Sequence, residues 1–262
     1  ALGYGALSAE TTGGTNTAIG YQSLSGQNAA ADVYNTAVGW NTGNAISSGA
    51  NNTIMGASAG SSLTTGGRNV AIGYTALYSE DTTGRVVAIG YQALENQDAA
   101  GNTYNVAIGY RAGRDIVGGV QNTLIGGDSG TALTSGSYNT ALGYNALEGT
   151  TIGTRNVAIG QDALATNILT DRNVAIGTAA LEAMVGDGVT NNQTTYNTAV
   201  GYGAGQAVTS GINNNLLGGL AGAALTAGAS NVAIGYAALS TETAHGRNIA
   251  IGELALGSQL AG

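Results

Sequence analysis

The sequence contains no cysteine, no proline, no phenylalanine and no lysine, and only 8% of its residues are charged. Because cysteine is absent, a disulfide framework and a thiolate metal site are both excluded. The formal net charge is −8, which disfavours nucleic acid and anionic membrane surfaces as partners. The sequence also has no run of about 18 apolar residues that could span a bilayer. We therefore expect no nucleic-acid binding and no membrane insertion by this segment.

Apolar residues make up 43% of the chain, and glycine contributes 45 residues. A disordered linker combines low hydrophobicity with high net charge, whereas aliphatic residues recur here in every stretch of the sequence. We therefore expect an ordered chain. The sequence starts at Ala1 in the middle of a motif, and we expect it to be a piece of a longer fibre.

A motif of the form N-[VT]-A-[IVL]-G-Y-x-A-[LG] recurs from one end of the chain to the other. Its central glycine, which we call position 0 of each repeat, occurs fifteen times between Gly3 and Gly252. Eleven of the fourteen intervals are 17 residues, and the others are 19, 19 and 24. We therefore predict one repeat domain over residues 1–262, built from fixed-length coils with occasional insertions.

Seventeen residues are too few for two packed helices with their connections. Val, Ile and Thr bounded by Gly, Asn and Ser predict short strands and turns. The sequence therefore predicts an all-β fold, a β-solenoid of about fifteen 17-residue coils. The aliphatic residue at position −1, such as Ile72, is predicted to form a core row. The residue at +3, such as Ala76, is always small, which predicts a close approach of another part of the chain.

Position −4 is asparagine in thirteen of the fourteen complete repeats, and only Val86 interrupts the row. Equivalent residues of stacked β-coils lie in register, so identical amides can hydrogen-bond from coil to coil. We interpret this row as a structural ladder that requires no ligand. The row consists of Asn16, Asn35, Asn52, Asn69, Asn105, Asn122, Asn139, Asn156, Asn173, Asn197, Asn214, Asn231 and Asn248.

The predicted strands are apolar on both faces. Val70 and Ile72 lie on one face of a strand and Ala71 on the other. A strand that is apolar on both faces is normally covered on both, and a thin coil can cover only one of them from within its own chain. We therefore expect copies of this chain to cover the second face, in a homo-oligomer for which a trimer is the first expectation.

A longer period of about 70 residues, from Gly39 to Gly109, indicates a duplicated block of four coils. In one coil of each block a larger residue, Ile54, Leu124 or Leu216, replaces the usual Ala at position −2. The aromatic residue at +1 is lost in the same coils. Such an exchange of large and small residues predicts a packed interior whose volume is conserved.

The segments Asn-Val-Ala-Ile-Gly-Tyr-Thr-Ala-Leu and Leu-Thr-Thr-Gly-Gly-Arg-Asn-Val-Ala-Ile-Gly resemble repeats of phage tail-fibre proteins. They are also similar to the head repeats of trimeric autotransporter adhesins. The resemblance covers essentially the whole chain and implies a left-handed β-roll, assembled as a homotrimeric fibre, that serves as a shaft or an adhesive head. The 17-residue coil and the Asn row depart from the adhesin heads and favour the phage-like version.

We expect a structural fibre shaft or adhesive stalk that holds or forms a receptor-attachment element. Its location would be extracellular, on a virion tail fibre or a bacterial cell surface. One alternative is a surface adhesin that binds cell-surface glycan or a protein receptor through its loops or its Tyr and Arg rows. An ice-binding solenoid ranks last, because the row at position −3 alternates Thr with Val.

We expect no enzyme activity, no cofactor and no metal site. The only histidine, His245, lacks a repeated carboxylate or thiol partner for catalysis or metal binding. Calcium-binding β-rolls need an aspartate that recurs in each coil, whereas the aspartates here fall at scattered positions. Position −5 often carries Arg or Tyr, such as Arg68 and Tyr104, and we interpret it as a rim of long amphipathic side chains.

Receptor recognition, if this segment provides it, is expected on the inserted loops, because stacking constrains the coil positions. The longest insertion runs from Glu182 to Thr195. We expect it to expose amides, a carboxylate and an apolar Met-Val pair. The candidate recognition residues are Met184, Val185, Asp187, Asn191, Asn192 and Gln193.

Overall fold

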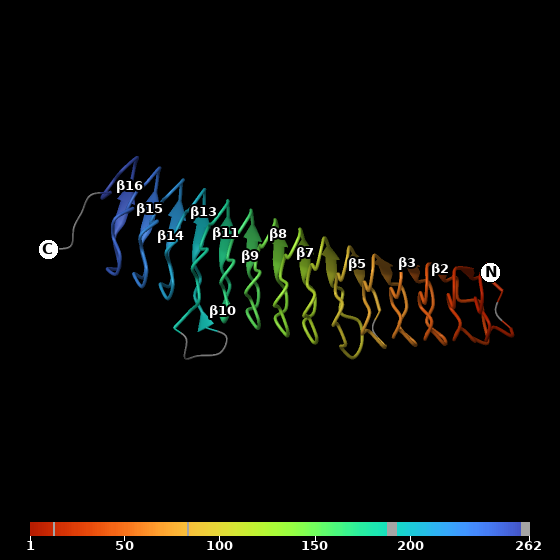
Figure 1. Cartoon of the computed structure of the whole chain (residues 1–262). Helices are drawn as coiled ribbons and strands as arrows, with labels where there is room; N and C mark the ends of the chain where they lie inside the picture. The colour runs from red at the N-terminus through yellow and green to blue at the C-terminus, as the bar shows by residue number, and fades with distance from the viewer. Residues whose placement is uncertain (13, 83, 188–192, 258–262) are drawn as a thin grey trace. The chain divides into compact units, whose positions relative to one another are not determined.

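The computed structural model describes residues 1–12, 14–82, 84–187 and 193–257. It divides into two compact units, Ala1–Gly127 (unit 1) and Asp128–Gly262 (unit 2), and each is described by itself. Within each unit the chain is an all-β, parallel β-solenoid (Figure 1). The described residues contain no helix, and so none that is long and apolar enough to cross a membrane. The predicted β-solenoid is confirmed.

Unit 1 is a ladder of short parallel strands, each paired with the strand of the next coil. Equivalent repeat positions lie directly opposite one another: Ala71 pairs with Ala88 across a 17-residue coil, and Ala88 pairs with Ala107 across a 19-residue coil. The insertions therefore leave the register unchanged. The strands are β1 (Thr17–Ile19), β2 (Thr36–Val38), β3 (Thr53–Met55), β4 (Val70–Ile72), β5 (Val87–Ile89), β6 (Val106–Ile108) and β7 (Thr123–Ile125).

Unit 2 repeats this arrangement, and Ala175 pairs with Ala199 across the 24-residue coil. Two additional strands, β10 (Thr170–Asp171) and β12 (Gln193–Thr194), pair in parallel as a small separate sheet beside that insertion. The main strands are β8 (Thr140–Leu142), β9 (Val157–Ile159), β11 (Val174–Ile176), β13 (Thr198–Val200), β14 (Asn215–Leu217), β15 (Val232–Ile234) and β16 (Ile249–Ile251).

The strands turn their small middle residue inward. Ala71 and Ala88, at position −2, are fully buried. The prediction that position −1 is a core row is wrong for the single chain, since Ile19 and Met55 are each 41% exposed and Leu142 is 46% exposed. Successive strand residues point to opposite faces, and the narrow interior of a short coil accepts alanine more readily than isoleucine at the strand.

Positions +4 and +7 share the rest of the interior. In most coils in which +4 is leucine, as at Leu94, position +7 is a polar residue such as Gln97, and both are fully buried. The coil of Leu181 is an exception, with Met184 at +7. Where +4 is glycine, an aliphatic residue at +7 fills the space, and a Cβ on Gly113 would lie 3.1 Å from Ile116 Cδ1 and 2.8 Å from Leu124 Cδ1. The larger residue at −2 is therefore accommodated in the core by glycine at +4, whereas the aromatic residue at +1, such as Trp40, is exposed and takes no part in this packing.

Each coil contains left-handed backbone at residues other than glycine. In one coil of unit 1 these are Arg68 (φ 63), Thr75 (φ 48) and Leu77 (φ 54), at positions −5, +2 and +4. Such a residue costs about 1–2 kcal/mol relative to a right-handed conformation. The turns are held by hydrogen bonds to neighbouring coils, such as Leu77 N–H to the Ala93 carbonyl at 3.0 Å and Thr75 N–H to the Ala57 carbonyl at 3.1 Å.

Candidate functional site: the outward sheet face and its two edges

The outer face of each sheet carries the side chains of positions −3 and −1. In β4 and β5 these are Val70, Ile72, Val87 and Ile89, which are all half-buried in the single chain. None of the residues at these two positions is charged in any strand of the main ladders. Position −1 is apolar in every one of these strands, whereas position −3 includes Thr and, in β14, Asn215. Exposed apolar surface marks interaction sites, so this face is the first candidate for association.

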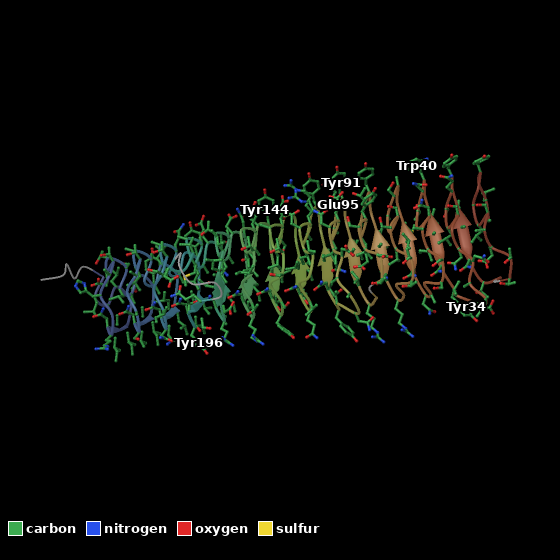
Figure 2. All side chains as sticks on the ribbon, turned by 90° about the horizontal axis from the view of Figure 1, so that it is seen from below. Tyr34, Trp40, Tyr91, Glu95, Tyr144 and Tyr196 are labelled. Atoms are coloured by element: carbon green, nitrogen blue, oxygen red, sulfur yellow. The ribbon has the colours of Figure 1, made fainter. Side chains whose placement is uncertain are left out.

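An aromatic row at position +1 follows one edge of the sheet. In unit 1, Tyr4, Tyr21 and Trp40 stack in sequence with ring centroids 5.4 and 6.3 Å apart. A second tract of Tyr74, Tyr91 and Tyr110 stacks at 5.3 Å per step, with interplanar angles of 14° and 12°. Ala57 separates the two tracts. In Figure 2, Trp40 and Tyr91 project along the same edge of this unit.

Stacking between the rings limits which of their faces a ligand could reach. Offset-stacked rings stabilise each other by about 0.5–1.5 kcal/mol per pair. A ring inside a tract, such as Tyr91, turns both of its faces to neighbouring rings and presents only its edge and hydroxyl to solvent. Within these two tracts the row therefore reinforces coil stacking, and the Arg111 guanidinium lies 4.8 Å from the ring centroid of Tyr110 at the end of the second tract.

Position −5 forms the other edge, where Figure 2 shows Tyr34 in unit 1. Arg85 lies over the Tyr104 ring at 5.5 Å, and its guanidinium donates to the Tyr104 hydroxyl at 2.9 Å. In unit 2, Arg155 lies over the Tyr138 ring at 5.0 Å. Arg and Tyr of neighbouring coils thus pair with each other along this edge.

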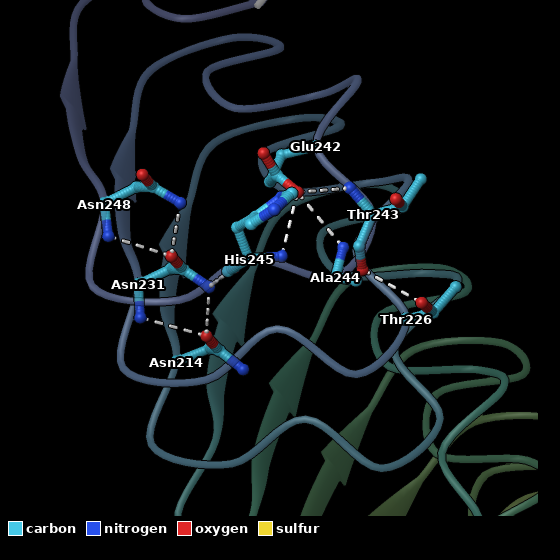
Figure 3. A network of polar contacts seen from close by, with 8 residues as sticks. All are labelled: Asn214, Thr226, Asn231, Glu242, Thr243, Ala244, His245 and Asn248. Atoms are coloured by element: carbon cyan, nitrogen blue, oxygen red, sulfur yellow. Dashed lines mark hydrogen bonds and ion pairs between the residues drawn. The ribbon is translucent and has the colours of Figure 1, made fainter. Parts of the chain in front are cut away.

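The Asn row is joined by hydrogen bonds from coil to coil. Asn231 donates its backbone N–H and its Nδ2 to Asn214 Oδ1, both at 3.0 Å, and Asn248 does the same to Asn231 (Figure 3). Asn214 Nδ2 also donates to the Gly228 carbonyl at 2.8 Å. Members between Asn35 and Asn231 are at most 1% exposed. Side chains so deeply buried are inaccessible to an external ligand.

A buried polar row at position +7 is absent from the sequence predictions. Gln97 accepts from Asn105 Nδ2 at 2.7 Å and donates from Nε2 to Glu80 at 3.0 Å. Both Gln97 and Glu80 are fully buried. Gln27 accepts in the same way from Asn35 Nδ2 at 2.8 Å. The alternation of leucine at +4 with a polar residue at +7 is the sequence signal that could have revealed this row.

Four of the six predicted recognition residues lie in the described part of the chain, and they differ in exposure. Met184 is fully buried, which corrects the expectation of an exposed Met-Val pair. It occupies the interior position +7, and its sulfur lies 3.9 Å from Asn197 Nδ2. Val185 and Gln193 are partly buried, and Asp187, which is exposed, donates its backbone N–H to Gln193 Oε1 at 2.8 Å. The last two predicted residues, Asn191 and Asn192, lie outside the described residues.

The only histidine, His245, lies in a turn that hydrogen bonds to Glu242 close. One Glu242 oxygen accepts from the backbone N–H groups of Thr243, Ala244 and His245 at 2.9, 3.1 and 2.9 Å. It also lies 2.9 Å from His245 Nδ1 (Figure 3). These hydrogen bonds, led by that of the His245 backbone, lower the pKa of Glu242, although burial opposes them. The residues that the structure describes include no cluster of three metal-ligating side chains.

Replacing Glu242 by glutamine should lower stability at neutral pH and have less effect in acid. The pKa of Glu242 is lower in the folded chain than in the unfolded chain, so the carboxylate stabilises the fold above its ordinary pKa of 4.5. This contribution is lost as the pH falls through the lowered value. Urea unfolding of both proteins at several pH values measures the difference, and a difference that stays constant into acid would contradict the assignment.

Comparison with known proteins does not assign the chain to a family. No family model, no curated protein and no solved structure matches it. Function is therefore inferred from the outward face, the two edge rows and their contacts.

Proposed function

We propose that this chain is a structural fibre segment that associates with copies of itself, as the shaft or adhesive stalk of an extracellular or virion appendage. The observation that carries the proposal is the uncharged outer face of the parallel sheet, with an aliphatic residue at position −1 of every strand in the two main ladders. Since Ala at −2 already faces the interior, this second apolar face has no cover within its own coil.

Self-association is the simplest way to cover such a face. Complete burial of an Ile or Val side chain contributes roughly 1.5–3 kcal/mol relative to full exposure, and Ile72, Ile89 and their equivalents are already partly covered. The gain per residue is therefore smaller, but it recurs in every coil. Identical chains arranged around one axis can each turn the same face toward a shared core, and a trimer is the assembly that we propose.

Replacing Ile72 and Ile89 together by aspartate should convert the trimer into monomers that keep their β-structure. Both side chains lie on the outer face, so the charges enter the proposed interface and not the interior. Sedimentation equilibrium measures the mass, and circular dichroism measures the fold. The matched control replaces Val117 and Ile168 by aspartate. Both residues lie outside the strands, and they are 49% and 43% exposed. A monomeric unaltered chain, or a trimer that survives the Ile72→Asp and Ile89→Asp changes, would refute the proposal.

A further inference from the structure

A polar groove lies on the position −5 edge of unit 1. Its volume is about 290 Å3, and it is lined by three successive coils and by Asn102 of the coil that follows them. The hydroxyl side chains of Ser48, Thr65 and Thr82, one from each coil, line it together with Asn51 and Arg68 of the −5 row. All five residues are exposed.

Arg68 is the only cationic residue that lines the groove. It makes no hydrogen bond or ion pair through its side chain with any described residue. Its neighbour along the edge, Arg85, is instead engaged by the ring and hydroxyl of Tyr104. Since the chain carries a net charge of −8, an unpaired guanidinium beside three hydroxyls is an unusual local feature.

The groove therefore offers a defined set of binding groups. Ser48, Asn51, Thr65 and Thr82 make no side-chain hydrogen bonds with described residues and remain available to a ligand. No aromatic residue lines the groove, so recognition there depends on hydrogen bonds and charge. Hydroxyls and an amide complement sugar hydroxyls, and a guanidinium binds a carboxylate through paired hydrogen bonds.

The spacing of the groups indicates a linear ligand. Equivalent side chains of stacked coils repeat about every 4.7–4.9 Å, which is close to the length of one hexopyranose unit in an extended chain. We propose that this groove binds an acidic oligosaccharide along the edge, with one sugar per coil and a uronic-acid carboxylate on Arg68. Asp81, next to Thr82, accepts a hydrogen bond from the Thr64 hydroxyl and does not line the groove.

Unit 2 supplies an internal comparison. An equivalent groove of about 360 Å3 follows the same repeat positions and also contains an arginine, Arg247. Alanines, Ala227 and Ala244, stand where unit 1 has Ser48 and Thr65 when Arg247 is matched to Arg68. The groove of unit 2 thus resembles that of unit 1 in shape and in its arginine, but it lacks the row of hydroxyl side chains. We therefore expect it to bind a uronic-acid chain much more weakly.

Binding of trigalacturonic acid to the whole chain, measured by isothermal titration calorimetry, tests the proposal. The unaltered chain should bind this acid and not its fully methyl-esterified form. Arg68→Gln should weaken binding about tenfold or more, because a hydrogen bond to a charged group is lost. Glutamine suits this position, since Gln121 occupies the same row with φ 57.

The matched control is Arg247→Gln, which should leave the affinity for trigalacturonic acid unchanged. Equal urea unfolding midpoints would show that neither variant perturbs the fold. The proposal is overturned if the acid fails to bind, if its ester binds equally well, or if Arg68→Gln has no effect. None of these outcomes depends on the proposed self-association, because Arg68 lies outside the strand rows at positions −3 and −1.

Discussion

Replacing Gly73 by alanine should destabilise unit 1 by about 3 kcal/mol or more. Gly73 has a φ of 138°, which residues with a side chain rarely adopt. An added Cβ would lie 2.2 Å from the Gly90 carbonyl oxygen and 2.6 Å from its carbon. Both contacts are with backbone of the next coil, so relief requires the coils to separate. The shift of the urea unfolding midpoint measures the effect.

The control for this substitution is Gly118→Ala in the same unit. A Cβ at Gly118 would meet no atom within 4 Å, and its φ lies outside the left-handed range. We expect this variant to unfold within about 0.5 kcal/mol of the unaltered chain. Similar losses of stability in the two variants would show that close approach of the coils at the central glycine does not constrain the fold.

Replacing Asn139 and Asn156 together by alanine should lower the stability of unit 2 by about 2–6 kcal/mol, because buried groups are left unpaired at about 1–3 kcal/mol each. Asn139 Oδ1 accepts from the Asn156 N–H at 2.9 Å, and Asn156 Oδ1 accepts from the Asn173 N–H at 3.0 Å. Their Nδ2 groups donate to the carbonyls of Gly153 and Thr170 at 2.9 and 2.8 Å. Thermal and urea unfolding measure the loss.

The matched control replaces Asn28 and Asn96 by alanine. Both are exposed asparagines outside the Asn row at position −4. Their side chains bond to Thr11 and Asp115 at the surface, where water can replace the partner. This variant should unfold almost as the unaltered chain does. An Asn139 and Asn156 variant that melts unchanged would refute the structural role of the ladder. We also expect trigalacturonate binding to be unaffected, because both asparagines are buried outside the groove.

The features of the fold that follow from periodicity could be predicted from the sequence. A fixed interval between central glycines implies coils in register, and the structure pairs Ala71 with Ala88 as that interval requires. The exchange of Ala for Leu124 indicated conserved interior volume, and the Cβ contacts of Gly113 show the reason. These predictions succeed because each rests on a relation that recurs in many coils.

Other features could not be predicted, for identifiable physical reasons. A strand such as Val70–Ile72 is apolar on both faces, so hydrophobicity alone does not tell which face is inward. The left-handed conformation of Leu77 contradicts local propensity and is held by contacts with neighbouring coils. Met184 occupies an interior position that its place in a long insertion concealed. The groove at Arg68 combines side chains of four coils that no local motif connects.

The accessibility of one thiol on the outer sheet face tests the proposed self-association most directly. The chain has no cysteine of its own, so Ile89→Cys introduces a single probe at position −1 of β5. In the native assembly we expect this thiol to react with a maleimide many times more slowly than the thiol of Val117→Cys, a residue that is 49% exposed outside the strands. Both thiols should react equally fast in urea. Equal rates in the native state would show that the face is open to solvent and would contradict assembly through it.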